Sequence, residues 1–507
     1  MPLTRTARVG FNTISNILRF AIALLVVIML TPLIIKTLGK EEFGLWSLTL
    51  SVLGFLGLLD FGFGTGLVKY VAECRATGEK EKLNEILSSL WATYLALSII
   101  SFLVVALISV FFHQIFEIAT PLHEKATIVL WLLALRTSIL SLPFSLFRGI
   151  LFGQQLIWQI NLIQSFSSIF YGLTAWFLLA NDHGIVQLAS ANLASMLLEG
   201  TAYVILVYSQ NPDIKIKLRL ANRESFRELA SFSFFTFIVS VSSLILLKTD
   251  PIIVQLFESL NAVAIYAIAL KIVENAHLFS KQFINAISPL ISELKAQQDE
   301  EKLRFALINC ARFALVPSLL LSLPIIAFAA DILRFWLGVG FEGAVLPLNI
   351  LLIAMLAAIP QMLASMILTM SGHQKTTAKA AIFSALVNIA ASLFLVRHYG
   401  IAGVAGGTLI ATIITDVFVI PAIAGGHFGI GWLSYWSRII LPLAPAITLN
   451  LGLCLTINHY FPASSLSDIA AKSIPGLIVF MVYWWSVSLE PSEKELFRKR
   501  LLKFKKD

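Results

Sequence analysis

The chain has 507 residues, of which 58% are hydrophobic and only 13% are charged. A soluble globular domain carries about 25% charged residues, and disordered chains are polar and rich in charge, so this composition excludes both classes. The mean hydropathy of +0.86 instead predicts an all-α polytopic membrane protein.

Fourteen stretches of the chain are long and apolar enough to cross the bilayer, for which about 20 residues are needed. The first is too long for a signal-peptide core and contains Arg19 and Pro32, so we expect it to remain as a helix. The predicted spans are residues 14–35, 45–68, 86–112, 125–147, 157–180, 184–208, 229–249, 260–284, 304–329, 344–370, 378–396, 401–424, 438–460 and 470–489.

The orientation follows from the distribution of lysine and arginine, because cytoplasmic loops carry an excess of both. The two termini and the loops after even-numbered spans hold 27 of these residues, and the opposite side holds 7. Both termini are therefore predicted to be cytoplasmic. The segment 493–507, which follows Trp484 and Trp485, is predicted to be a short basic helix on an anionic leaflet.

The loops between spans are too short to fold as a catalytic domain, since the longest, residues 209–228, has about twenty residues. HExxH, GxSxG and P-loop motifs are absent, and Cys74, Cys310 and Cys454 lack metal-ligand spacing. The run Gly62–Gly66 superficially resembles a nucleotide loop, but it lies in an apolar span, where we favour close helix packing. The sequence predicts no enzyme, metal, cofactor or nucleic-acid partner.

An internal duplication organises the chain. Residues 72–83 read AECRATGEKEKL and residues 292–303 read SELKAQQDEEKL, an offset of 220. At similar offsets, Pro32 matches Pro251, residues 153–155 match 372–374, and residues 183–185 match 399–401. Six spans separate each pair, so the repeats have the same orientation in the membrane, which is typical of carriers with two lobes.

The predicted organisation is therefore two parallel six-helix lobes around a central cavity, with two further helices. The boundaries are residues 1–208 for the N-lobe, 209–228 for a basic cytoplasmic linker, 229–424 for the C-lobe, and 425–507 for spans 13 and 14 with the basic tail. A channel or a receptor gives no comparable reason for the doubling.

The first two spans carry a recognisable series of motifs: Pro32–Ile35 with Leu38-Gly39, then Glu42–Trp46, then Leu58–Gly64. This series resembles the opening of the polysaccharide flippases of the multidrug/oligosaccharidyl-lipid/polysaccharide (MOP) exporter superfamily, which translocate O-antigen and capsule repeat units. The layout of six, six and two spans is similar to that branch along the whole chain.

The resemblance implies an alternating-access flippase that moves an undecaprenyl-pyrophosphate-linked oligosaccharide from the inner to the outer leaflet of the plasma (inner) membrane. It implies membrane lipids and polysaccharide polymerase or assembly proteins as partners. The alternative is a multidrug/cation antiporter of the same superfamily, which would have twelve spans and acid-dominated cavities. A membrane-embedded polymerase component, a third class, would need a large outer loop, which is missing.

Ionisable side chains inside spans are candidate functional residues because burying them in hydrocarbon is costly. The basic candidates for contacting substrate in the cavity are Arg19, Arg136, Lys271 and Arg312. For Arg136 the alternative is a structural ion pair with another helix. Lys271 could pair with Glu274, three residues on, and Arg312 could extend to the cytoplasmic interface.

The acidic candidates, which could bind a coupling ion or make helix–helix hydrogen bonds, are Asp60, Glu199, Glu274 and Asp416. Four buried acids against four buried bases do not determine the charge of the substrate. The anionic substrate is implied by the resemblance alone.

Overall fold

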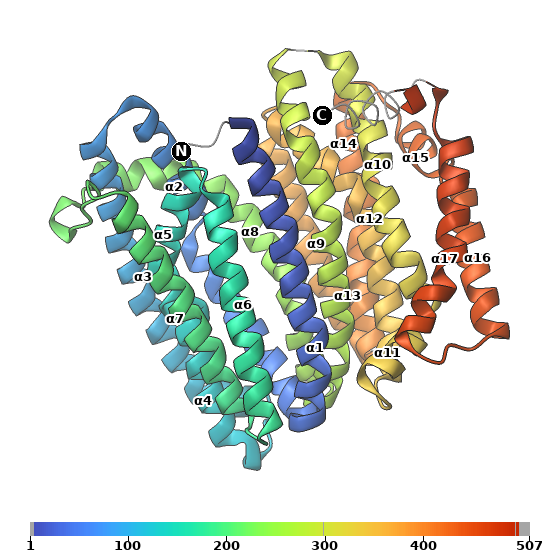
Figure 1. Ribbon diagram of the computed structural model, residues 1–507, viewed down its shortest axis with the longest axis horizontal. Helices are drawn as coiled ribbons and strands as arrows, with labels where there is room; N and C mark the ends of the chain where they lie inside the picture. The colour runs from blue at the N-terminus through green and yellow to red at the C-terminus, as the bar shows by residue number, and fades with distance from the viewer. Residues whose placement is uncertain (1–4, 298, 492, 496–507) are drawn as a thin grey trace. The chain divides into compact units, whose positions relative to one another are not determined.

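The computed structural model describes residues 5–297, 299–491 and 493–495. Within these ranges the chain is helical, with no β-strand, which confirms the predicted all-α membrane fold (Figure 1). Ten of the described helices are long and apolar enough to cross a membrane, or eleven if one bent pair forms a single span. The predicted basic helix at 493–507 lies mostly outside the described residues.

The number of continuous apolar stretches is smaller than fourteen partly because two of them, Ile14–Asp60 and Gln374–Phe428, each cover most of two predicted spans. Helix α1 (Arg5–Gly54) changes direction at Gly39, and α13 (Gln374–Thr412) changes direction at Gly400. Both glycines have positive φ, 77° and 54°, a backbone conformation that glycine adopts without steric cost. The count of fourteen spans stays a prediction.

The chain divides into two compact units, Met1–Ala264 and Ile265–Asp507. The division falls within α9 (Leu260–Ala296), so α8 (Arg223–Phe257) groups with the first unit, whereas the sequence repeat assigns it to the second lobe. The lobe limits drawn from the repeat stay a prediction.

Unit 1 is a bundle in which α1 runs beside α6 and α6 beside α7 (Figure 1). Its remaining elements are η1 (Phe55–Asp60), α2 (Phe63–Thr77), α3 (Lys80–Ile115), η2 (Thr120–Leu122), α4 (His123–Ala134), η3 (Leu135–Ile139), α5 (Ser141–Gly153), α6 (Ile157–Ala180), α7 (Ile185–Gln210) and η4 (Leu218–Leu220). The core of this unit is aliphatic and aromatic, and it includes the fully buried Tyr94.

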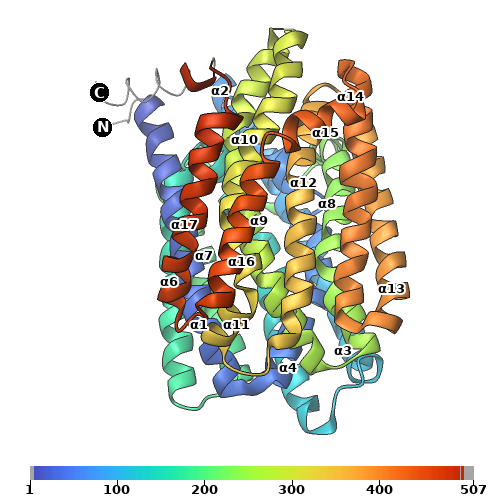
Figure 2. The same cartoon turned by 90° about the vertical axis from the view of Figure 1, so that its right-hand side faces the viewer.

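Unit 2 pairs α12 with α13 and ends in the hairpin of α16 and α17 (Figure 2). Its elements after α9 are α10 (Glu300–Ala327), α11 (Ala329–Leu337), η5 (Glu342–Ala344), α12 (Val345–Met370), α13, η6 (Ile413–Val419), α14 (Ile420–Phe428), α15 (Trp432–Ile440), α16 (Ala444–Tyr460), α17 (Leu466–Tyr483) and η7 (Trp484–Ser488). The predicted span 438–460 is the bent pair of α15 and α16, whose axes differ by 47°.

The second predicted span, 45–68, is interrupted. Helix α1 ends at Gly54, a 3₁₀ segment follows, and Phe61 and Gly62 have φ of 48° and 74° before α2 begins. A Cβ on Gly64 would meet only an Asp60 carboxylate oxygen at 3.6 Å. The predicted helix packing is therefore wrong for Gly64, which instead faces a cavity, where irregular backbone is tolerated in a membrane protein.

Candidate functional site: an arginine-lined cavity in unit 1

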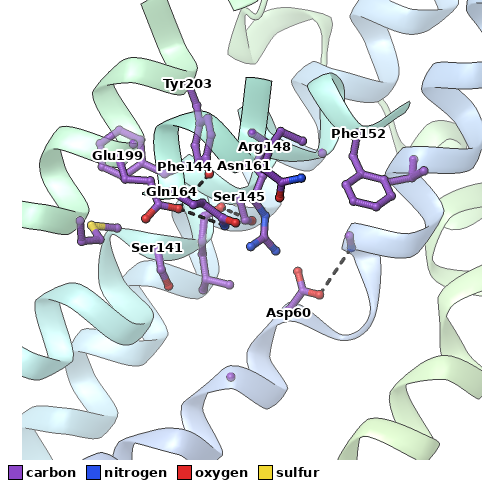
Figure 3. A pocket seen from close by; sticks show the side chains of 18 of the residues that line it. Asp60, Ser141, Phe144, Ser145, Arg148, Phe152, Asn161, Gln164, Glu199 and Tyr203 are labelled. Carbon is purple, nitrogen blue, oxygen red and sulfur yellow. Dashed lines mark hydrogen bonds between the residues drawn. The ribbon is translucent and has the colours of Figure 1, made fainter. Parts of the chain in front are cut away.

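Unit 1 contains an open cavity of about 990 Å³. Five charged side chains line it: Arg19, Asp60, Arg136, Arg148 and Glu199. Figure 3 shows the guanidinium of Arg148 and the carboxylate of Asp60 on facing walls of the open space. The neutral polar lining comprises Asn16, Thr65, Thr137, Ser141, Ser145, Asn161, Gln164 and Tyr203.

One wall of the cavity is a polar stripe on η3 and α5. Thr137, Ser141, Ser145 and Arg148 are spaced by four, four and three residues, which places them on one helix face. Arg136 lies beside this stripe, on the π-helical turn Leu135–Ile139. Such turns occur frequently at functional sites.

The π-helical turn is stabilised from outside the helix. Pro143 has no N–H, so it cannot donate to the carbonyl of Ile139, four residues earlier. The hydroxyl of Ser98 on α3 donates to that carbonyl instead, at 2.7 Å. Arg136 lies on this turn and lines the cavity.

Both acids of the cavity are bound by neutral donors. Asp60 accepts a hydrogen bond from the Tyr94 hydroxyl at 2.6 Å and a longer one from the Gly64 N–H at 3.4 Å. Glu199 accepts from the Tyr203 hydroxyl at 2.9 Å and from the Gln164 amide at 3.4 Å. These contacts hold the carboxylates against the cavity wall.

The three arginines, in contrast, form no ion pair with any residue that the structure describes. The Nε atoms of Arg19 and Arg136 are buried and have no hydrogen-bond partner there. Arg136 interacts electrostatically with Glu199 at longer range. With three cations facing two acids that already have hydrogen-bond donors, the cavity presents unpaired N–H groups suited to an anion.

The structure brings four of the eight predicted site residues into this cavity, Arg19, Asp60, Arg136 and Glu199. The other four, Lys271, Glu274, Arg312 and Asp416, belong to unit 2. Lys271 and Glu274 lie one turn apart on α9, so a mutual interaction and a ligand role both stay open.

Arg312 does not line the cavity of unit 1. It forms a buried ion pair with Glu493, and the two side chains are 6% and 3% exposed. The predicted cavity role of Arg312 and the alternative of an extended interfacial side chain both stay predictions. The partner lies 181 residues away in sequence.

Arg148 was missed by the sequence analysis, which placed it in a cytoplasmic loop at the end of a span. The signal that could have found it is the stripe of polar residues at helical spacing that ends at Arg148. Gly149, the next residue, allows α5 to approach Leu67 of α2, since a Cβ there would lie 2.4 Å from a Leu67 methyl carbon.

Unit 2 contains a second polar pair. Asp416 lies on the π-helical turn Ile413–Val419 and accepts a hydrogen bond from the Gln361 amide of α12 at 2.9 Å.

The same turn is stabilised by side chains of α15. Pro421 has no N–H, so the carbonyl of Val417 lacks its α-helical donor. Two indole N–H groups of α15, from Trp432 and Trp436, donate to that carbonyl at 2.7 and 2.8 Å.

Residues 6–295, more than half of the chain, match the polysaccharide biosynthesis protein family. The chain belongs to this family. Residues 232–394 also match the MatE family, and together these matches confirm the resemblance to MOP-superfamily polysaccharide flippases.

Sequence relatives of the chain support its assignment to this family. It is 22% identical to the uncharacterised membrane protein EpsK of Bacillus subtilis, over 97% of this chain and 98% of that protein. It is 21% identical to a putative O-antigen transporter of Shigella flexneri, over 78% and 92%. It is 23% identical to the probable low-salt glycan biosynthesis flippase Agl15 of Haloferax volcanii, over 75% and 76%.

Solved structures share the fold of this family member. The lipid II flippase MurJ in an inward closed conformation has a TM-score of 0.71 at 17% identity, covering 97% of this chain and 99% of MurJ. An inward-facing multidrug resistance MATE transporter has a TM-score of 0.67 at 17% identity, covering 80% and 98%.

Proposed function

We propose that the protein is an alternating-access flippase for a lipid-linked oligosaccharide, with undecaprenyl pyrophosphate as the lipid carrier. The observation that carries the proposal is the cavity of unit 1. There Arg19, Arg136 and Arg148 have no ion-pair partner among the described residues, while both acids are bound by neutral donors. A pyrophosphate supplies the anionic oxygens that guanidinium groups bind through paired charge-assisted hydrogen bonds.

The direction of transport in this proposal is from the inner to the outer leaflet of the plasma (inner) membrane. A sugar-pyrophosphate head cannot cross hydrocarbon unaided, because its charges and hydroxyls would lose hydration. The membrane potential is worth about 2.3 kcal/mol per charge per 100 mV, and it favours movement of an anionic head out of an inside-negative cell. Both termini are cytoplasmic in this scheme, and the lobes at 1–208 and 229–424 alternate about the linker.

Asp416 is the proposed coupling residue. In unit 1 the acid Glu199 lies within electrostatic reach of Arg136, whereas in unit 2 the donor to Asp416 is the neutral Gln361. A carboxylate in a membrane span without a cationic partner is costly, so a proton or another small cation would relieve the charge. Asp60 and Glu199 we assign instead to positioning and to contacts with sugar hydroxyls.

The proposed function is tested by reconstituting the purified protein into liposomes with an undecaprenyl-pyrophosphate-linked oligosaccharide. The sugar should become accessible to an enzyme or lectin on the far leaflet. Asp416→Asn should retain substrate binding but lose the response of transport to an imposed pH gradient. Exchange of cationic drugs for protons, with no movement of the lipid-linked sugar, would favour the antiporter, which the MatE match raises as the second candidate.

A further inference from the structure

The segment between α7 and α8 is held as an ordered strap along the start of α3. This strap, residues 211–222, is the green loop that leads from α7 to α8 in Figure 1. The backbone N–H groups of Lys215 and Lys217 donate to Asn84 Oδ1 at 2.9 Å and Ser88 Oγ at 3.1 Å. Asn222 closes the strap, with its N–H on Ser89 Oγ at 2.9 Å.

The bonding pattern fixes which side chains face outward. Alternate residues of an extended segment point to opposite sides. Ile214 is 7% exposed and joins the core of unit 1, and Ile216 packs against the same core. Lys215 and Lys217 alternate with them and are exposed, and Arg219, in the 3₁₀ turn Leu218–Leu220 that follows, is exposed as well. The strap therefore presents a fixed row of three cations.

Two acids near this row are already engaged. Asp213 forms an ion pair with Lys80 at 2.6 Å, and the hydrogen bond from Lys80 lowers the pKa of Asp213 below its usual value. Glu85 accepts a hydrogen bond from the Asn222 amide at 2.9 Å. Lys215, Lys217 and Arg219 form no ion pair with the residues that the structure describes.

Two large apolar side chains accompany the cations. Leu218 is 60% exposed between Lys217 and Arg219, and Phe226, in the first turn of α8, is 41% exposed. Exposed apolar groups interleaved with basic ones are typical of surfaces that insert into an anionic membrane interface, where the apolar groups reach the acyl boundary and the cations reach phosphate groups. A solvated loop gives no reason for this arrangement.

We propose that the strap is a binding surface for anionic phospholipid headgroups of the bilayer, with Lys215, Lys217 and Arg219 contacting the phosphates and Leu218 inserted beside them. The inference goes beyond the proposed function, because the lipids bound here are structural partners and not the transported substrate. It rests on the backbone hydrogen bonds and the exposed cations of the strap and not on the transport activity, so it can fail or succeed independently of the flippase assignment.

The test places a fluorophore on Leu218→Cys in a Cys310→Ser background, where the other two cysteines, Cys74 and Cys454, are buried. Two kinds of vesicle are prepared from phosphatidylcholine and phosphatidylglycerol. In one kind the phosphatidylcholine carries brominated chains, and in the other the phosphatidylglycerol does. Bromine quenches the fluorophore only when the two are nearly in contact. Brominated phosphatidylglycerol should quench severalfold more than brominated phosphatidylcholine, and added salt should reduce the difference. Equal quenching by the two lipids would overturn the proposal.

Two variants sharpen the test. Lys215→Gln/Lys217→Gln/Arg219→Gln should abolish the preference for phosphatidylglycerol, whereas removing the same charge at Lys295, Lys375 and Lys379 should leave it intact. Asn84→Ala/Ser88→Ala keeps every cation but releases the strap, and it should weaken the preference. If either the triple charge variant or Asn84→Ala/Ser88→Ala keeps the full preference for phosphatidylglycerol, the strap is not the binding surface. Relief of quenching by undecaprenyl pyrophosphate would assign the strap to the substrate path and overturn the commitment to bilayer lipids.

Discussion

Replacing Arg136 and Arg148 together with alanine should abolish flipping of the lipid-linked oligosaccharide. Each guanidinium offers charge-assisted hydrogen bonds to a phosphate, and losing one such contact costs roughly 10- to 100-fold in affinity. Arg136→Lys should be milder, since an ammonium keeps the charge but not the paired geometry. The measurement is the rate at which the sugar head appears on the far leaflet of proteoliposomes.

Folding is not expected to limit this result. Removing a charge from a span makes insertion into the membrane easier, and neither arginine forms an ion pair within the described part of the chain. Arg334→Ala is the matched control, because Arg334 is exposed on α11 and does not line the cavity of unit 1. If well-expressed Arg136→Ala/Arg148→Ala flips substrate at the parental rate, the cavity arginines do not bind the pyrophosphate.

Arg312→Ala should destabilise the protein strongly without acting on the cavity. It leaves Glu493, which is 3% exposed, as a buried charge without its cation. Breaking a buried ion pair from one side costs about 3–5 kcal/mol, which should appear as a lower unfolding temperature in detergent.

The apolar double change Arg312→Met/Glu493→Leu should recover most of that stability, because no unpaired charge remains. A normal unfolding temperature for Arg312→Ala would show that the pair contributes little. A specific loss of substrate binding in a stably folded Arg312→Ala would support the predicted substrate contact of Arg312.

The sequence alone identified the site residues whose charge is unusual for their surroundings. Arg19, Asp60, Arg136 and Glu199 attract notice because each is ionisable within an apolar span, and all four line the cavity. Arg148 does not stand out in this way, because it lies at the end of its span beside a predicted loop. Arg148 lines the cavity because of the way α5 is rotated about its own axis. The spacing of Arg148 from Ser141 and Ser145 is only a weak sign of that rotation.

Contacts between segments far apart in the chain could not be predicted from local sequence patterns. The partner of Arg312 is 181 residues away, and the donors to the Val417 carbonyl are side chains fifteen and nineteen residues later. The break in the second span depends on Phe61, a non-glycine residue at φ 48°. Hydropathy treats that segment as one continuous span, since it counts apolar residues and not backbone conformation.

Substrate protection of Ser145→Cys tests the central claim most directly. Ser145 lies on the polar stripe, lines the cavity and is one helical turn from Arg148. In the Cys310→Ser background, a water-soluble thiol reagent should modify this cysteine in the free protein. An undecaprenyl-pyrophosphate-linked oligosaccharide should slow that modification, and the matching neutral lipid without pyrophosphate should not. Equal modification rates with and without the pyrophosphate-linked sugar, at concentrations that support transport, would contradict substrate binding in the arginine-lined cavity.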